Sequence, residues 1–383
     1  MTTNTAISNT VNTINKQPIY FLSHGGPTFL DENDEFGSNK GAFRTTRKIG
    51  DEIKKVLNPD YIVVLSGHWQ AYPESQLSYN KKDAKFKYGG IFGNKNNNHV
   101  PLVQVATPAE LLNKIASWEE MENEFAENKL IYDFYGFPDY LYKETFKSVV
   151  STNVLARIRK VFEQYNLKNG VSDKRIDVEF VRRDIDHGVW VPLKVAQLDD
   201  LHKMGGNSIG SGSNNAPIPI VQMSLLADNS FSDHFYKLGD IIKLLRKDNA
   251  MVICSGMSVH NLGDLRYIYM DTNGNKFPYV LEFNNYLHDL ILNDKFELSV
   301  QKNHNKLFDG LQQLNTDPNL IKLLYKAHPT LDHFLPFVAA CGGMFPNEFG
   351  VELYNDQQFS LGWGIYKYGG PDNNLKGLEH DEL

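Results

Sequence analysis

The sequence predicts an α/β fold in which one mixed sheet is flanked by helices on both faces. Short apolar runs rich in β-branched residues alternate along the chain with longer amphipathic segments. Neither a linker nor an internal repeat divides the 383 residues, and 41% of them are hydrophobic. We therefore expect a single domain at 18–370, between a disordered tail at 1–17 and a second tail at 371–383.

Each expected element rests on its own local pattern. Runs ending at Gly, Pro or Ser predict strands, and a Thr-Pro-Ala-Glu start predicts one of the helices. Polar stretches at 94–99 and 205–215 are typical of surface-loop insertions. The expected strands are 18–22, 61–65, 175–181, 217–224 and 250–254, and the expected helices are 42–57, 107–125, 139–162, 233–246, 279–292 and 330–341.

Charge and composition narrow the partners and the compartment. With a net charge of -7 and no large basic cluster, the chain is not expected to bind nucleic acid or an anionic membrane. Cys254 and Cys341 lie in apolar runs and are typical of buried thiols in a reducing compartment. The N-terminus lacks secretory features, whereas the chain ends in the ER-retention tetrapeptide His380-Asp-Glu-Leu383. We expect a cytoplasmic monomer or homodimer, with the ER lumen as the alternative.

Histidines follow three of the expected strands. His24 comes after Tyr-Phe-Leu-Ser, His68 after Val-Val-Leu-Ser-Gly, and His260 after Val-Ile-Cys-Ser-Gly-Met-Ser-Val. Ligands of an open α/β sheet bind at the carboxyl ends of its strands, so these imidazoles are expected to share one edge. That arrangement predicts a metal or acid–base site. A hydrogen-bonded structural role is the alternative for each histidine taken singly.

Two further histidines and three aromatic residues join the candidate site. His187 follows a strand within Asp-His-Gly, although Arg183 and Asp186 offer it an alternative salt-bridge network. His333 is expected in the first turn of a helix, which favours a neutral imidazole. Phe134, Phe137 and Trp69 are candidate walls of a substrate pocket, and packing in a turn is the alternative for the two phenylalanines. The remaining histidines are expected to be solvated or structural: His99, His202, His234, His288, His304, His328 and His380.

Six motifs occur in an order that resembles a known family. They are Ser-His-Gly-Gly-Pro at His24, Ser-Gly-His-Trp at His68, Asp-Phe-Tyr-Gly-Phe-Pro from Asp133, Asp-His-Gly at His187, Ser-Gly-Met-Ser-Val-His-Asn-Leu at His260 and Pro-Thr-Leu-Asp-His-Phe-Leu-Pro at His333. Together, over about 18–364, they resemble the 4,5-DOPA extradiol dioxygenase family, which is the class III or LigB-type branch of ring-opening dioxygenases.

The resemblance implies a LigB-like fold with one metal ion at the carboxyl ends of the strands. By this resemblance His24, His68 and His333 would be metal ligands, and His260 would be a catalytic base and a fourth metal contact. His187 would be a second acid–base group. The cofactor would be Fe(II) or Zn(II), one per chain, because His333 stands where the prototype has a glutamate and an all-nitrogen site suits zinc at least as well as iron.

The implied reaction is the opening of a DOPA-like catechol by O2 to a muconic semialdehyde. His260 would take a phenolic proton and His187 would supply one to the developing oxygen. Two other functions remain open at this point. One is a metal-binding interaction module of the same fold without dioxygenase activity. The other is a zinc hydrolase, for which Asp186 or Asp332 would be the general base.

Overall fold

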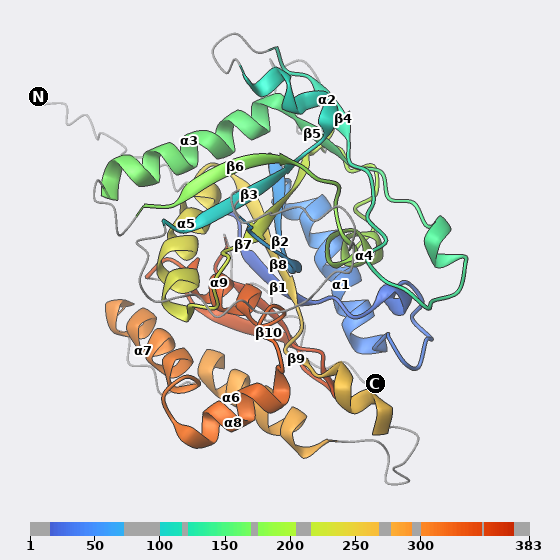
Figure 1. Cartoon of the computed structure of the whole chain (residues 1–383), viewed down its shortest axis with the longest axis vertical. Helices are drawn as coiled ribbons and strands as arrows, with labels where there is room; N and C mark the ends of the chain where they lie inside the picture. The colour runs from blue at the N-terminus through green and yellow to red at the C-terminus, as the bar shows by residue number, and fades with distance from the viewer. Residues whose placement is uncertain are drawn as a thin grey trace, which may run out of the picture.

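An eight-stranded mixed sheet forms the centre of the computed structural model (Figure 1). The structure describes residues 16–72, 100–116, 122–169, 175–203, 216–267, 277–292, 300–346 and 348–370. The sheet order is β10-β13-β1-β8-β2-β7-β3-β6. Its strands are β1 (Ile19–Ser23), β2 (Tyr61–Gln70), β3 (Leu102–Thr107), β6 (Asp177–Arg182), β7 (Ile220–Leu225), β8 (Ala250–Gly256), β10 (Gly350–Tyr354) and β13 (Ile365–Tyr368).

The four central strands run parallel, and this direction decides where the site lies. β1 pairs with β8, β8 with β2, and β2 with β7, all in parallel register. β13 is antiparallel to β1, and β3 is antiparallel to β7 but parallel to β6. The carboxyl ends of β1, β8 and β2 therefore lie next to one another at one edge of the sheet.

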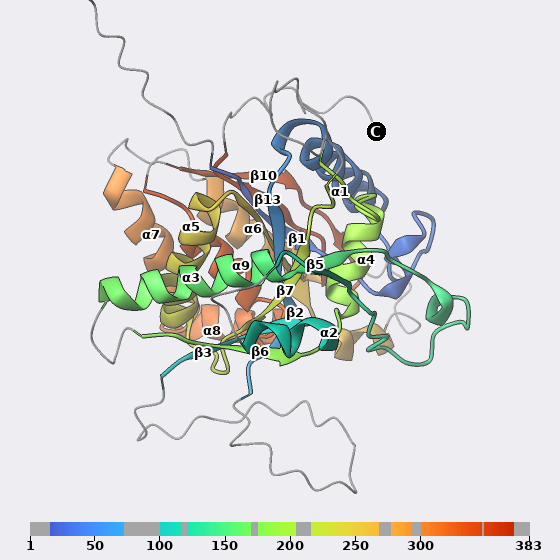
Figure 2. The same cartoon turned by 90° about the horizontal axis from the view of Figure 1, so that it is seen from above.

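Helices cover both faces of the sheet. In Figure 2, α1 and α4 lie on one side of the central strands, and α5 and α9 lie on the other. Two π-helical turns, Ile53–Leu57 and Asp233–Leu238, extend α1 and precede α5. The longer helices are α1 (Lys40–Glu52), α3 (Thr152–Asn169), α4 (His187–Val195), α5 (Gly239–Lys247), α6 (Pro278–Leu292), α7 (Val300–Gln313), α8 (Pro318–Ala327) and α9 (Leu335–Gly342).

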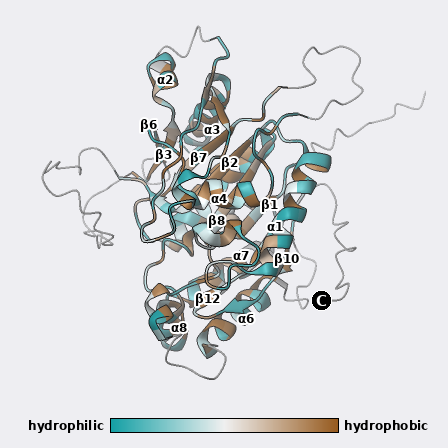
Figure 3. Ribbon diagram, turned by 90° about the vertical axis from the view of Figure 1, so that its right-hand side faces the viewer, coloured by the Kyte–Doolittle hydropathy of each residue, from teal (hydrophilic) through white to brown (hydrophobic). Residues whose placement is uncertain are grey.

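Residues of the central strands alternate between two apolar cores. In β1, Ile19 and Phe21 pack into the core beneath α5 and α9, whereas Tyr20 and Leu22 pack into the core beneath α1 and α4. Both faces of these strands are buried, so their sequences are almost continuously apolar. In Figure 3, hydrophobic residues fill much of the central strands, and hydrophilic residues alternate with hydrophobic ones along outer helices such as α1 and α8. The predicted α/β class, a single domain with one mixed sheet flanked by helices on both faces, is confirmed.

Two of the expected helices are wrong in large part. Instead of a helix over 107–125, β3 ends at Thr107, and only α2 (Ala109–Leu112), a 3-10 turn (Lys114–Ala116) and β4 (Phe125–Glu127) follow among the described residues. β4 pairs with β5 (Val149–Ser151), which lies inside the expected helix 139–162. The β-branched run around Val149 favours a strand, and α3 begins only after it, at Thr152. Tertiary pairing outweighed helix signals in both segments.

The expected helix over 330–341 begins later than predicted. α9 starts at Leu335 with Pro336 in its first turn, which is the position that proline favours. His333 therefore lies in the turn before α9, not inside the helix. A small sheet of β9 (Val259–His260), β12 (Leu361–Gly362) and β11 (Gln357–Gln358) was not predicted. The expected insertions at 94–99 and 205–215, most of the first tail and the tail at 371–383 lie outside the described residues. Among the described helices, none has the length and apolar content to cross a membrane.

Candidate metal centre

Three histidines predicted to share one edge of the sheet do lie there. His24 directly follows β1, and His68 lies near the carboxyl end of β2. β8 leads through Met257 and Ser258 to His260 on β9. Because β1, β8 and β2 are parallel neighbours, their carboxyl ends bring these rings together, as the strand-end pattern indicated.

His333 reaches the same edge from the turn before α9. Its carbonyl oxygen accepts a hydrogen bond from the backbone N–H of Met257 at 3.1 Å. A β-carbon at Gly256 would lie 2.2 Å from that oxygen, so only glycine allows the turn to approach the end of β8. This close contact holds His333 against the strand ends, far along the chain from the other histidines.

The Nε2 atoms of three histidines converge on one point. The Nε2 atom of His68 lies 3.2 Å from Nε2 of His24 and 3.3 Å from Nε2 of His333. His24 and His333 are 1% and 3% exposed, so water has little access to these atoms. Ligand atoms about 2.0–2.1 Å from a tetrahedral metal ion lie about 3.3 Å apart, which matches these separations.

The hydrogen bond of His24 fixes which of its nitrogens carries the proton. Its Nδ1 lies 2.9 Å from Oγ of Ser255, and that hydroxyl donates its own proton to the carbonyl of Gly188. Nδ1 of His24 must therefore be the donor to Ser255, which leaves a lone pair on Nε2. Burial, followed by the neighbouring histidines, holds the pKa of His24 well below its usual value and keeps the ring neutral.

Carboxylates fix the other two rings in the same way. Nδ1 of His68 lies 3.2 Å from Asp133, and Nδ1 of His333 lies 3.0 Å from Asp332. Burial lowers the pKa of His68, but the hydrogen bond and charge of Asp133 outweigh it and leave the pKa raised. With their Nδ1 protons directed at carboxylates, both rings present Nε2 to the shared point. Three imidazole nitrogens oriented by outer partners are a donor set that fits a divalent transition metal.

Asp133 joins a second histidine to this group. Its Oδ1 accepts hydrogen bonds from Nδ1 of His187 at 2.8 Å and from the His187 backbone N–H at 2.9 Å, while Oδ2 contacts His68. The rings of His68 and His187 are 4.1 Å apart between centroids. Burial lowers the pKa of His187. The sequence motif contains Asp133, but its contacts with His68 and His187 were not predicted, because they join residues that lie far apart in the sequence.

The salt-bridge alternative for His187 is not what the structure shows. Arg183 pairs with Asp186 at 3.0 Å, and the partner of His187 is Asp133. Asp186 is fully buried and accepts a hydrogen bond from Ser66 at 2.8 Å. Since the Ser66 hydroxyl accepts the backbone N–H of His68 at 3.1 Å, Asp186 supports the strand end that carries His68.

His260 lies beside the converging nitrogens but not among them. Its ring stacks on that of His333, with 3.6 Å between centroids and 13° between planes. The described side chains that bring three ligand atoms within 4.8 Å of one another are His24, His68 and His333 in one group, and His68, Asp133 and His187 in another. Burial and the neighbouring His333 hold the pKa of His260 well below its usual value, so the ring is neutral.

Only part of the expected pocket wall adjoins the histidines. Phe134 meets the ring of His187 edge-on at 5.6 Å, and Phe137 packs edge-on against Phe134 at 5.5 Å. Trp69 follows His68 in β2, so its side chain leaves the opposite face of the strand, where it packs under Arg183. The phenylalanines thus border the site, and Trp69 is not brought to it.

The sequence also matches a known protein family over most of its length. Residues 114–356 match the family described as the catalytic LigB subunit of aromatic ring-opening dioxygenase. The chain belongs to the LigB family. This confirms the resemblance seen in the motifs, and it assigns this LigB-family protein to the aromatic ring-opening dioxygenases, for which dependence on a metal is typical.

Similar proteins carry related names. A 4,5-DOPA dioxygenase extradiol-like protein of Schizosaccharomyces pombe is 25% identical over 85% of this chain and 84% of its own length. A 4,5-DOPA dioxygenase extradiol of Beta vulgaris is 27% identical over 68% of this chain and 83% of its own. A crystal structure of an uncharacterized protein from Escherichia coli K12 covers 92% of this chain and all of its own chain, with 18% identity and a TM-score of 0.51. That structure supports the fold alone.

Proposed function

We propose that this LigB-family protein opens the ring of a DOPA-like catechol with O2 at one metal ion bound by His24, His68 and His333. The product would be a muconic semialdehyde. The observation that carries this proposal is the convergence of three Nε2 lone pairs whose Nδ1 partners are all fixed. The names of the similar proteins from Schizosaccharomyces pombe and Beta vulgaris favour DOPA as the first substrate to test.

The side chains divide the work according to their positions. A metal ion held by His24, His68 and His333 would supply Lewis acidity that lowers the pKa of the catechol hydroxyls. His260, buried and neutral beside His333, accepts one of the hydroxyl protons. His187 returns a proton to the oxygen that develops as the ring opens, and Asp133 stabilises its charged form. Phe134 and Phe137 keep water from this side of the site.

The nitrogen donor set leaves the metal to be identified as Fe(II) or Zn(II), one per chain. Fe(II) is our proposal for turnover, because ring opening by O2 needs an ion that exchanges electrons and zinc does not. The hydrolase alternative is disfavoured by the carboxylates. Asp332 is engaged by His333 and Thr330, and Asp186 by Ser66, Gln222 and Arg183, so neither is free to act as a general base.

Oxygen uptake tests the proposal. Protein reconstituted anaerobically with Fe(II) is given L-DOPA and a few simple catechols while visible absorbance is followed. We expect uptake coupled to a yellow product, which is lost with the metal in His24→Ala. His260→Gln should retain the metal and lose about 10²–10⁴-fold in turnover, the usual contribution of a general base. His288→Gln, at a partly exposed surface histidine, should behave as wild type.

Two outcomes would contradict these assignments. Loss of metal in His260→Gln equal to that in His24→Ala would make His260 a ligand. Absence of uptake with every catechol, from protein that retains one zinc per chain, would favour the interaction module over the dioxygenase.

A further inference from the structure

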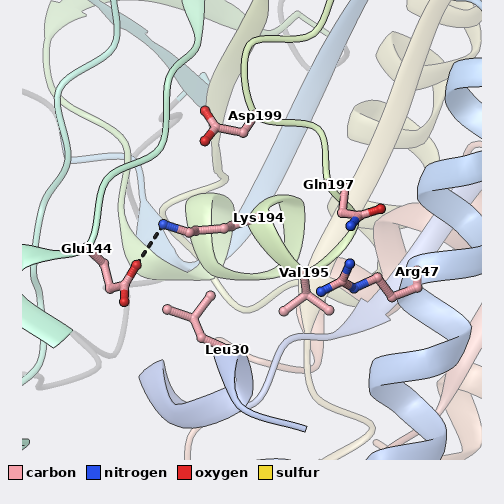
Figure 4. A pocket seen from close by; sticks show the side chains of 7 residues that line it. All are labelled: Leu30, Arg47, Glu144, Lys194, Val195, Gln197 and Asp199. Atoms are coloured by element: carbon pink, nitrogen blue, oxygen red, sulfur yellow. Dashed lines mark hydrogen bonds and ion pairs between the residues drawn. The ribbon is translucent and has the colours of Figure 1, made fainter. Parts of the chain in front are cut away.

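A cavity of about 440 Å³ lies at the end of α4 that is remote from the histidines (Figure 4). α4 begins at His187 and ends at Val195, so about 12 Å of helix separates the cavity from the metal centre. Leu30, Val195 and the stem of Lys194 line it together with Arg47 from α1 and Gln197 from the loop after α4. The volume is in the range of small-ligand sites.

Most of the charges at this cavity already have partners. Nζ of Lys194 binds the carboxylate of Glu144 at 2.7 Å and the carbonyl of Thr145 at 2.5 Å. Oδ1 of Asp199 accepts the backbone N–H of Lys147 at 2.5 Å. These pairs leave Arg47 as the lining cation to which the described residues offer no carboxylate.

Arg47 is also short of hydrogen bonds. Its Nε is shielded from solvent and has no acceptor among the described residues, although a guanidinium carries five donors. The group packs over the ring of Phe43 at 5.1 Å, and Figure 4 shows it beside the amide of Gln197. Gln197 has a φ of 58°, a left-handed conformation that is costly for a residue with a β-carbon. The strained backbone is therefore at the residue whose side-chain amide lies beside Arg47.

We propose that this cavity binds a small organic carboxylate with an apolar body. The carboxylate would take the planar fork of Arg47 and the amide N–H of Gln197, and the apolar part would cover Leu30 and Val195. The lining carries two cations, Arg47 and Lys194, and two carboxylates, Glu144 and Asp199, so it is neutral before a monoanion binds. Asp199 at the rim disfavours a phosphate dianion. The site is independent of the dioxygenase proposal, because none of its residues belongs to the metal centre.

Saturation-transfer difference NMR with isovalerate and its neutral analogue isovaleramide tests this proposal on the zinc-loaded protein. Isovalerate should show methyl signals that titrate, and isovaleramide should bind at least about tenfold more weakly, because a charge-assisted hydrogen bond to a partly buried guanidinium is lost. Arg47→Gln should weaken isovalerate by a similar factor and Gln197→Ala by less. Arg44→Gln removes an exposed arginine of the same helix, which pairs with Glu32, and should change nothing.

The possible results separate the cavity from other sites. Equal binding of acid and amide, or isovalerate binding that survives in an Arg47→Gln protein with unchanged melting temperature, would overturn the proposal. Survival of binding in Arg47→Gln would place the carboxylate outside the cavity, for example at the zinc ion. Arg47→Lys keeps the positive charge but removes the planar guanidinium. Binding of isovalerate between that of wild type and that of Arg47→Gln supports a carboxylate held by both the charge and the shape of the guanidinium.

Discussion

At the scale of single residues, Asp133 links two histidines of the candidate site, His68 and His187. One of its oxygens faces His68 and the other faces His187, so a single carboxylate orients a proposed metal ligand and a proposed acid. These bonds, together with burial, set its charge: burial raises the pKa of Asp133, but the two histidines outweigh it and hold the pKa far below the usual value. The carboxylate therefore remains ionised and accepts both N–H groups.

Replacing Asp133 by Asn should weaken metal binding by about 10–100-fold, the usual cost of removing an outer partner of a ligating histidine. An amide has one acceptor oxygen where the carboxylate has two, so one ring loses its orientation. Competition for Zn(II) with a coloured chelator measures the affinity. Asp139→Asn, at an exposed position in the same loop, is the matched control. Unchanged affinity in Asp133→Asn would show that His68 does not need this partner.

The buried His328 should make stability depend on pH. Burial, as the largest cause, lowers its pKa to about 4, although its hydrogen bond to the carbonyl of Ser258 at 2.8 Å raises it. In the unfolded chain the pKa is about 6.5, so between pH 6.5 and 4 the unfolded state alone binds this proton. The free energy of unfolding therefore falls as pH falls through that window, by about 3 kcal/mol in total, and is unaffected above it.

Urea unfolding at pH 7 and pH 4.5 checks this expectation. His328→Gln keeps an N–H donor for Ser258 but does not titrate, so its loss of stability between the two pH values should be smaller by roughly 2 kcal/mol. Carboxylates with lowered pKa values, such as Asp332, act mainly below this window. The site histidines contribute equally to both proteins. A pH dependence identical in wild type and variant would assign the effect to other groups.

At the scale of elements, the turn after β1 positions His24. Gly25 has a φ of 62°, and a β-carbon there would lie 2.4 Å from the ring of Trp363. Gly25→Ala should cost more than about 1–2 kcal/mol, the left-handed penalty alone, and should weaken metal binding because His24 shifts with the turn. Gly26→Ala is the control, since a β-carbon at Gly26 meets nothing within 4 Å. Thermal unfolding and zinc affinity are measured for both variants. Equal values for Gly25→Ala and Gly26→Ala would contradict the role of this turn.

Elements that are defined by local composition were predictable from the sequence. The apolar runs of β1, β2 and β8 predicted strands, and the histidines that follow them predicted a shared edge. The helices predicted around β4 and β5 were wrong, because the pairing of these strands joins distant residues and no local pattern encodes it. His333 was expected at the site from the helix start predicted around it and from the resemblance; it does lie there, but in the turn before α9. Asp133 and Ser255, which fix the ring protons, were not predicted because hydrogen bonds between distant side chains leave no periodic signal.

At the scale of the whole molecule, a buried ion pair that stabilises the fold and the candidate metal site lie at opposite ends of the central strands. Arg246, at the end of α5, is fully buried and binds Glu348 through two bonds of 2.6 and 2.7 Å. It also donates to the carbonyls of Gln17 and Gly343, and so joins the start of β1 to the end of α9. These contacts lie at the amino ends of β1 and β8, whereas the histidines lie at the carboxyl ends of those strands.

Glu348→Gln should therefore lower stability and leave the site intact. Removing the carboxylate leaves a buried guanidinium without its partner, at a cost of about 3–5 kcal/mol. Zinc stoichiometry should remain that of wild type at temperatures where the variant is folded. Glu163→Gln breaks an exposed ion pair on α3 and should cost less than about 1 kcal/mol. Loss of zinc from folded Glu348→Gln would mean that the two ends of the central strands are coupled.

The order in which the three converging histidines leave the ribosome has a consequence for the cell. His24 and His68 emerge first, and His333 follows 265 residues after His68. An ion that needs all three nitrogens must therefore wait until His333 has been translated. A nascent or truncated chain offers two imidazoles, which compete poorly with cellular chelators. The proposed metal site is therefore assembled only in chains that include the turn before α9.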